Sequence, residues 1–598
     1  MRRFLQRVAF VYHASYARTV SGVPIDPSRA DEILAFLLDQ KLIHPRDVSR
    51  PIPASYENLL RVHTPAYLES LQDPATLTAI FGAPVPADEV PGILDLQRLS
   101  VGGTIQATRL LLDRSAGIAV NLKGGLHHAA PARGMGFCVF NDIAVAIRRL
   151  RAPPRGFRDP VLVIDLDLHD GNGTRAVFAD DPTVYTFSIH NRTWDDAPAV
   201  AATSLALGEG VTDESYLAAL RDALPPVIQA HKPRLVFYIA GCDPAADDRL
   251  GDWRITPAGM LERDRFVVDT VRGSGAAPLV IVPGGGYGPS AWRYSARFFG
   301  WLVSGNVSEP PSDMELALGR FRPIARQFAE EARVGPVTAE GGNEWSLTDA
   351  DLVGLAHGSG AEPKVLEHYS RHGLELLLER LGFFKQLRDR GFPHPVLDVA
   401  FGHALGGGHT IRVFGDAERR SLVMELRLSR NRRVVPGMDV LYVEWLLLQN
   451  PRAAFGGRLA PLPGQEHPGL GMLGEVAAWL LVMCETLGLD GVVFEPAHYY
   501  TAALGQHRLR FLEPEDQAWF EALRDAVAGM SLADAERAIG EARVVDEATG
   551  APACWRPAPM VVPATARLEV LVKGPSYERA LALARGATHL RLVPRSRG

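Results

Sequence analysis

The chain has 598 residues, too many for one ordinary hydrophobic core, so we expect about two to four domains. Hydrophobic residues make up 47% of the chain and charged residues 22%, as in soluble globular proteins, which excludes a disordered or fibrous protein. The net charge of −6 does not favour a nucleic-acid partner bound through a basic surface. The four cysteines contain no C-x-x-C pair, which argues against a disulfide framework and a thiolate zinc site.

The apolar stretches of the chain predict no membrane anchor. The run near the N-terminus is short, interrupted and lacks a small-residue cleavage site. The most apolar later stretch, Val476–Met483, is too short to span a bilayer. We therefore expect a soluble, cytoplasmic protein.

In the first half of the chain, predicted strands alternate with predicted helices. We expect strands at Arg7–Tyr12, Ile118–Leu122, Val161–Leu168, Val184–Ile189, Arg234–Ala240 and Pro278–Val282, and helices at Arg29–Leu42, Tyr56–Leu71, Gly102–Leu112, Asp142–Leu150, Tyr216–Ala230 and Leu261–Arg272. Such alternation predicts an α/β fold, in which a parallel sheet carries helices on both faces.

A polar, Pro-rich stretch, Asn306–Asp313, predicts a domain boundary. We expect a first domain over 1–305, a linker over 306–315 and an α+β domain over 316–598, with a further division near residue 555 as an alternative. The second half predicts helices at Met314–Arg333, Glu362–Arg390, Glu475–Leu487 and Glu515–Val527, a strand meander through Pro395–Gly402, Thr410–Phe414, Arg420–Leu428 and Val440–Leu448, a strand at Gly491–Phe494 and a strand–helix–strand tail across Leu568–Val593.

The predicted strand Val161–Leu168 carries polar residues that its apolar neighbours do not explain. Asp165, Asp167 and His169 stand two apart, so in an extended chain they point to the same side. Unpaired, each would cost several kcal/mol in a core strand, a cost that a bound cation would offset. The following glycine turn places them at the carboxyl end of the strand, where open parallel sheets bind ligands. A salt-bridged strand end is the alternative.

Three further signals lie at strand ends. His127 and His128 follow two glycines, Asp243 ends a second apolar strand, and Tyr287 follows three glycines. Taken singly, the histidines are equally explained by a surface loop, Asp243 is better explained by a helix or turn cap, and Tyr287 has a plain glycine turn as its alternative. Four such signals at the ends of neighbouring strands favour one shared site.

These residues resemble the histone deacetylase and acetylpolyamine amidohydrolase superfamily. The resemblance rests on Gly124–Ala129 with Gly136–Asp142, on Asp165–Thr174, on Ala240–Asp243 and on Gly284–Tyr287, in that order, and it runs from about Arg7 to about Val303.

The resemblance implies a zinc-dependent amidohydrolase with a role for each site residue. Asp167, His169 and Asp243 would bind Zn(2+), His128 would be the general base with His127 beside it, and Tyr287 would stabilise the oxyanion. Asp165 would orient His127, and Asn172 would face His128. Phe137 and Gly136 would line a narrow substrate tunnel, and a structural K(+) would lie near Asp165, Ser188 and Ile189.

Some residues depart from that pattern. Asp170 stands where many relatives have histidine or glutamine, and we expect it to add negative charge beside the metal. The rim at Trp194–Ser204 follows no relative's pattern, which leaves the substrate open. Ala245 stands where an arginase-like two-metal site would need a second carboxylate, and Cys242 is expected to be a small buried filler.

The C-terminal half is loosely similar to an acetyl-coenzyme A-dependent N-acetyltransferase. A Gly/Pro loop with Gln465, Gly469 and Gly471 precedes a helix, but its spacing departs from that family's. A structural α+β domain that binds a partner or shapes the substrate entrance is the favoured alternative. Glu495 and His498 are further polar groups that follow a strand.

The sequence thus predicts removal of acetyl or other acyl groups from lysine side chains or small amines. The alternatives are a catalytically silent acetyl-amine binding scaffold, and a bifunctional protein with a C-terminal acetyltransferase-like domain. We expect neither nucleic acid nor a membrane as a partner, and the oligomeric state stays open.

Overall fold

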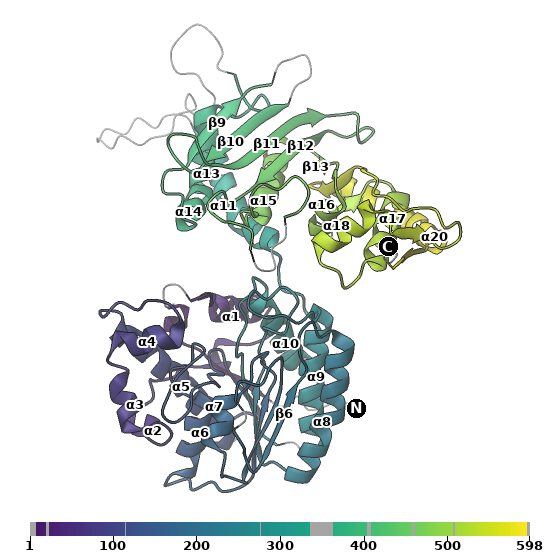
Figure 1. Ribbon diagram of the computed structural model, residues 1–598. Helices are drawn as coiled ribbons and strands as arrows, with labels where there is room; N and C mark the ends of the chain where they lie inside the picture. The colour runs from purple at the N-terminus through teal and green to yellow at the C-terminus, as the bar shows by residue number, and fades with distance from the viewer. Residues whose placement is uncertain are drawn as a thin grey trace, which may run out of the picture. The chain divides into compact units, whose positions relative to one another are not determined.

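The computed structural model describes residues 7–18, 23–113, 115–195, 197–275, 277–334, 363–402, 408–456, 461–505 and 509–594. The chain forms two compact units, residues 1–310 and 311–598, and each builds its own large sheet (Figure 1). The division falls between Pro310 and Pro311.

The first unit is built on an eight-stranded sheet in the order β2-β1-β3-β8-β7-β4-β5-β6. Every neighbouring pair is parallel, as the alternation of strands and helices predicts. The strands are β1 Val8–Val11, β2 Val48–Ser49, β3 Ile118–Asn121, β4 Val161–Asp165, β5 Val184–His190, β6 Ala202–Ala206, β7 Leu235–Ile239 and β8 Leu279–Val282.

Helices cover both faces of this sheet, with α6 and α7 on one side and α8 and α9 on the other (Figure 1). The first core packs apolar side chains of α5 and α6 against Val163 and Phe237, whereas Tyr238 points the other way and donates to Asp264 of α9. The helices are α1 Arg29–Asp39, α2 Tyr56–Leu59, α3 Pro65–Ser70, α4 Pro74–Phe81, α5 Val90–Leu112, α6 Asp142–Arg151, α7 Asn172–Val177, α8 Asp213–His231, α9 Pro257–Gly273 and α10 Ala291–Ser304, with 3-10 turns at Ala14–Ala17 and Pro45–Asp47.

Two predicted helices of the first unit have other bounds than expected. The stretch Tyr56–Leu71 is two helices, because Thr64 caps a new helix that has Pro65 at its first position. Helix α5 begins at Val90, well before the predicted start at Gly102. Gly102 lies inside the helix, where a Cβ would meet the carbonyl oxygen of Ile52, so this glycine allows close packing.

The second unit contains a seven-stranded sheet in the order β14-β16-β13-β12-β11-β10-β9. Strands β9 to β12 form the predicted antiparallel meander, and β13 is parallel to β12. The strands are β9 Val396–Ala400, β10 His409–Phe414, β11 Leu422–Asn431, β12 Val440–Leu448, β13 Gly491–Phe494, β14 Arg510–Phe511 and β16 Met560–Pro563, while β15 Val544–Asp546 and β17 Leu590–Leu592 form a separate pair.

The helices of the second unit are α11 Asp313–Val334, α13 Arg371–Arg380, α14 Phe383–Asp389, α15 Leu473–Leu487, α16 Tyr499–Gly505, α17 Pro514–Ala526, α18 Leu532–Gly540, α19 Ala566–Lys573 and α20 Pro575–Ala587. The tail therefore has a helix at Leu568, where a strand is predicted, because Thr565 caps α19. Strand β16 pairs with β13, so the sheet continues past residue 555 and offers no support for a division there.

Two features of composition can be compared with the structure. None of the described helices is long and apolar enough to cross a membrane. All four cysteines are free thiols; Cys138, Cys242 and Cys484 are buried and Cys554 is exposed.

Candidate metal centre and active site

The carboxyl ends of four neighbouring strands carry the polar residues singled out in the sequence. In the sheet β3, β8, β7 and β4 lie side by side. His127 and His128 follow β3, Tyr287 follows β8, Asp243 follows β7, and Asp165 ends β4. The topology therefore brings together residues that lie up to 160 positions apart in the chain, at the edge where parallel sheets bind ligands.

The exit of β4 is bent by its own carboxylates. The strand ends at Asp165, so the expectation that it runs on to Leu168 is wrong. Oδ1 of Asp165 accepts from the backbone N–H of Asp167 at 3.2 Å, and Oδ1 of Asp167 accepts from that of His169 at 3.0 Å. Such local bonds compete with the ladder of the sheet and turn the chain.

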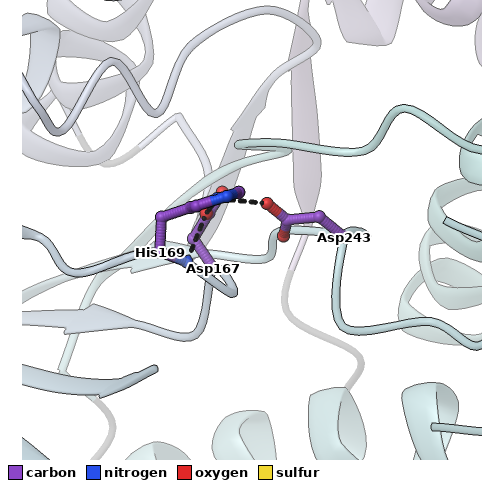
Figure 2. Close-up of side chains that lie close together, drawn as sticks. All are labelled: Asp167, His169 and Asp243. Atoms are coloured by element: carbon purple, nitrogen blue, oxygen red, sulfur yellow. Dashed lines mark hydrogen bonds and ion pairs between the residues drawn. The ribbon is translucent and has the colours of Figure 1, made fainter. Parts of the chain in front are cut away.

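Asp167, His169 and Asp243 form a compact group in which both carboxylates meet one imidazole nitrogen (Figure 2). Nδ1 of His169 lies 3.1 Å from Oδ1 of Asp167 and 2.9 Å from Oδ2 of Asp243. One candidate ligand atom from each residue lies within 4.8 Å of the others, and this is the one such group among the described residues. The group can hold one metal ion.

The charges in this group favour a cation. Burial and, after it, the charge of Asp167 raise the pKa of Asp243 to about 7. Burial alone would lower the pKa of His169, yet hydrogen bonds to Asp167 and Asp243 raise it to about 11. Two carboxylates fully removed from water thus hold a proton on the imidazole between them, and a metal ion would replace that proton.

The paired histidines have different partners. Nδ1 of His127 lies 2.7 Å from Oδ2 of Asp165, a carboxylate that is itself buried. Nδ1 of His128 lies 3.1 Å from Oδ1 of Asn172, a neutral amide. The structure thus places Asp165 and Asn172 against the two histidines that the family resemblance pairs with them.

These partners give the two imidazoles different pKa values. Burial alone would lower the pKa of His127, but the charges of Asp165 and Asp167 raise it to about 9. Burial and the neighbouring charge of His127 hold the pKa of His128 well below its usual value. At neutral pH one ring is a cation and the other is neutral, with a nitrogen able to take a proton.

The loop with Tyr287 packs against the acidic group. The N–H of Gly285 donates to Oδ2 of Asp167 at 2.7 Å, and Oδ2 of Asp248 accepts from the N–H of Tyr287 at 2.6 Å. Burial, together with the charges of Asp243 and Asp167, raises the pKa of the Tyr287 phenol well above its usual value. This phenol stays protonated and is a hydrogen-bond donor.

The two predicted tunnel residues occupy an unusual backbone segment. Gly136 has φ +54° and Phe137 has φ +66°, although Phe137 is not a glycine. A Cβ at Gly136 would lie 2.4 Å from the ring of His128. The rings of Phe137 and Tyr287 have centroids 5.7 Å apart. The strained turn therefore sets an aromatic side chain beside the phenol.

The residues expected near potassium lie on β4 and β5. Asp165 pairs in register with Ser188, and both line a small cavity together with Arg175. The hydroxyl of Ser188 lies 2.9 Å from Nδ1 of His190, and Ile189 is buried in β5.

Two of the departures have structural explanations. Arg175 donates to both carboxylate oxygens of Asp170, so the charge of Asp170 is paired, and the expectation of added negative charge at the metal is wrong. The buried thiol of Cys242 accepts from Nη2 of Arg29 at 3.2 Å, and burial raises the pKa of Cys242, in accord with a buried filler. Ala245 is buried as well.

Several side chains that touch the site have no strong signal in the sequence. The indole of Trp194 stacks on His128 at 4.2 Å between centroids, with 7° between the planes. Nη1 of Arg263, from α9, donates to the carbonyls of Leu166 and Gly241 behind the metal group. Trp194 could have been noticed as a tryptophan in a polar loop. Nothing in the sequence distinguishes Arg263 from other arginines in helices.

The polar groups noted in the second half do not form a comparable cluster in the described residues. His498 lies 3.1 Å from Glu536, and Gly469 forms a β-bridge with Gln449. Gly471 has φ +72° directly before α15, while the N–H of Gln465 donates to Leu462 within the loop. Glu495 follows β13.

Comparison with known proteins identifies the first unit. Residues 23–299 match the histone deacetylase domain. The chain is 36% identical over 279 residues to an uncharacterized protein of Picosynechococcus, covering 46% of this chain and 91% of that protein. It is 34% identical over 310 residues to histone deacetylase 2 of Arabidopsis thaliana, covering 49% and 78%. The crystal structure of an HDAC homologue complexed with SAHA has 26% identity and a TM-score of 0.43, covering 50% of this chain and 84% of that one.

The chain belongs to the histone deacetylase family. The match lies within the first unit, which carries a deacetylase domain of the hydrolase class on an α/β fold. The second unit lies outside the residues that match the histone deacetylase domain.

Proposed function

We propose that the first unit is a zinc-dependent amidohydrolase that removes acetyl groups from lysine side chains or small amines. The observation that carries this proposal is the group Asp167, His169 and Asp243, facing one charged imidazole, one neutral imidazole and a phenol. Two carboxylates and one imidazole fit zinc, and three protein ligands leave a position open for substrate, as in catalytic sites.

Asp167, His169 and Asp243 would hold the zinc ion. When bound, zinc supplies Lewis acidity, which polarises the acyl carbonyl and lowers the pKa of water. The neutral ring of His128 accepts a proton from the attacking water, because its pKa is low and its ring lies beside the metal group.

His127 and Tyr287 act on the charge that develops during the reaction. The imidazolium of His127, held by Asp165, opposes negative charge at the reacting centre. The phenol of Tyr287 donates to the oxyanion of the tetrahedral intermediate. Return of the proton from His128 to the leaving nitrogen breaks the C–N bond and yields acetate and a free amine.

The substrate within this class stays open. Phe137 and Gly136 would form one wall of a narrow tunnel for the aliphatic chain, and Trp194, which is 39% exposed, stacks on His128. Acetyl-lysine peptides and acetylated polyamines both present such a chain. A panel of the two substrate types would separate them.

The metal and the phenol provide the main test. Purified protein should contain about one zinc ion per chain and release acetate from an acetyl-lysine or acetylpolyamine reporter. Tyr287→Phe should lower kcat by about 10²–10³-fold with the zinc content unchanged, and His128→Ala should lower it by about 10²–10⁴-fold. Metal-free protein, or variants as active as the wild type, would defeat the proposal.

A second candidate function concerns the second unit. Its parallel pair β12 and β13 is joined through a Gly/Pro loop and helix α15, and pairs over Leu441–Val443 only, while β12 continues to Leu448. This crossover supports the alternative of an acetyltransferase-like domain, since loop N–H groups before a helix suit a pyrophosphate. Titration calorimetry with acetyl-coenzyme A tests it; lack of binding favours a structural or partner-binding role.

The remaining expectations from the sequence stay proposals. A catalytically silent scaffold would lack part of the group, whereas His127, His128 and Tyr287 are present with all three candidate ligands. A potassium ion beside Asp165 and Ser188 stays a prediction, as do a cytoplasmic location and the absence of nucleic-acid and membrane partners.

A further inference from the structure

Asp170 and Arg175 form a buried ion pair next to the metal group. Nη1 of Arg175 donates to Oδ1 of Asp170 at 2.6 Å, and Nη2 donates to Oδ2 at 2.9 Å. The side chain of Asp170 is fully buried and that of Arg175 is 7% exposed. A bidentate pair removed from water has one well-defined geometry, and loss of either partner would leave an uncompensated charge.

This pair fastens the loop that follows β5. Nη2 of Arg175 also donates to the backbone oxygen of Asp195 at 2.8 Å and to its Oδ1 at 2.9 Å. The N–H of Trp194 donates to Oδ2 of Asp170 at 3.1 Å. The indole of Trp194 is thereby held flat against the ring of His128.

Oδ2 of Asp195 determines the orientation of the Asn172 side-chain amide. Oδ2 of Asp195 accepts from Nδ2 of Asn172 at 3.0 Å. An ionised carboxylate only accepts hydrogen bonds, so the NH2 end of the amide must face Asp195. Oδ1 of Asn172 then faces Nδ1 of His128, at 3.1 Å. Since that oxygen only accepts, Nδ1 of His128 carries the hydrogen and Nε2 has the free lone pair.

We infer that Arg175, with Asp170 and Asp195, is a positioning group that fixes the tautomer of His128 through the amide of Asn172. The inference rests on the proposed function, in which His128 takes a proton from water. Without the carboxylate of Asp195 the amide can rotate and present NH2 to His128, which would move the hydrogen to Nε2 and remove the base. Asp170, which stands where many relatives have histidine or glutamine, is thus paired with Arg175, five residues later in the chain.

The test uses the full chain, three variants of the positioning group and one control variant. Asp195→Ala removes the acceptor at a side chain that is 26% exposed, so folding should survive. Arg175→Gln removes the charge that holds Asp195, and Arg175→Lys restores a charge without the bidentate geometry. Arg192→Gln is the matched control, because Arg192 lies in the same loop but pairs with Glu209 in solvent.

Kinetics provide the first readout. Asp195→Ala and Arg175→Gln should lower kcat by about 10- to 100-fold, with KM and zinc content close to wild type. Arg175→Lys should recover part of kcat, and Arg192→Gln should behave as wild type. A fall in kcat that comes with loss of zinc, or a kcat within about twofold of wild type for Asp195→Ala, overturns the inference.

The second readout does not depend on activity. Nitrogen-15 NMR of protein labelled at histidine distinguishes the two tautomers, and the signal of His128 is assigned by its absence from His128→Ala. Wild type should show Nδ1–H, and Asp195→Ala a mixture of tautomers. The Nε2–H form in wild type, or an unchanged spectrum in the variant, contradicts the inference. Inactive wild-type protein with the expected spectrum would instead defeat the proposed function and leave the positioning intact.

Discussion

His127 and His128 are adjacent in sequence, and their different roles arise entirely from their partners. A buried carboxylate beside His127 stabilises its cationic form, whereas an amide beside His128 adds no charge. Burial and the cation of His127 then disfavour a second charge on His128. Two titratable groups driven apart in this way supply an electrostatic group and a base at one pH. The motif of two adjacent histidines identifies the pair in the sequence. It does not tell which ring is charged and which is neutral, because Asp165 and Asn172 determine that difference.

A third histidine, His63, links this pair to the rest of the first unit and should make its stability sensitive to acid. Nδ1 of His63 donates to the carbonyl of Ala130, and Nε2 accepts from the N–H of Asn141, at 3.1 Å each. The bond from Asn141 needs the neutral ring, because a protonated Nε2 cannot accept a hydrogen bond, and burial lowers the pKa of His63 to about 4. The unfolded chain therefore takes up the proton first, near pH 6.5. The contribution of His63 to the free energy of unfolding should be constant above that pH and fall by about 3 kcal/mol between pH 6.5 and 4.

Urea unfolding of the wild type and of His63→Gln across this pH range measures the effect. Because glutamine does not titrate, the pH dependence of the variant should be smaller by this amount, whatever its stability at pH 7. His44→Gln, at an exposed histidine, should keep the wild-type dependence. Parallel curves for wild type and His63→Gln would show that His63 is not protonated on unfolding.

At the scale of elements, the first turn of α7 packs directly on the backbone of the histidine pair. A Cβ at Gly173 would lie 2.3 Å from the carbonyl carbon of His128 and 2.6 Å from the carbonyl oxygen of His127. The backbone atoms cannot swing aside as a flexible side chain would, so Gly173 is required for this approach. Gly173 therefore fixes the distance between α7, which supplies Asn172 and Arg175, and the two imidazoles.

Gly173→Ala should destabilise the first unit and lower activity together. Alanine would favour the helix by about 1 kcal/mol, but the collision should cost more, for a net loss of about 1–3 kcal/mol. Gly273→Ala is the matched control, because Gly273 ends α9 with open space around it. Thermal unfolding and kcat should both fall for the first variant and stay near wild type for the second. A fully stable Gly173→Ala variant would contradict the packing.

The order and type of most elements follow from the sequence, because buried parallel strands are continuous apolar runs and the candidate ligands stand where those runs end. What the local pattern misses depends on contacts distant in sequence. Asp165 ends β4 through bonds from its own carboxylate, which a period-two pattern does not contain. The role of Asp170 needs Asp195 and Asn172 in space, which only the folded loop after β5 provides. Thr565 and Thr64 are helix caps that override the apolar periodicity beside them.

At the scale of the molecule, the first unit carries the candidate metal centre, and the second unit has a fold without an assigned role. All eight strands of the parallel sheet lie before Pro310, with every group of the candidate metal centre. The second unit has its own sheet, and its main core runs from Met314 to Val492. Units with separate cores of this size are expected to fold as independent domains.

The fragment 1–310 should therefore fold alone, bind about one zinc ion and retain kcat within about twofold of the full chain on a small acetyl-lysine reporter. The reason is that no ligand, base or oxyanion donor of the proposed site lies beyond Tyr287. Metal analysis, circular dichroism and kinetics on the fragment measure these quantities, and the same fragment with Tyr287→Phe serves as the inactive control. The fragment 311–598 should show a cooperative unfolding transition of its own and no deacetylase activity. A folded, zinc-loaded 1–310 fragment with strongly reduced kcat would instead mean that the second unit takes part in the reaction, because the metal and both histidines would then be present without being sufficient.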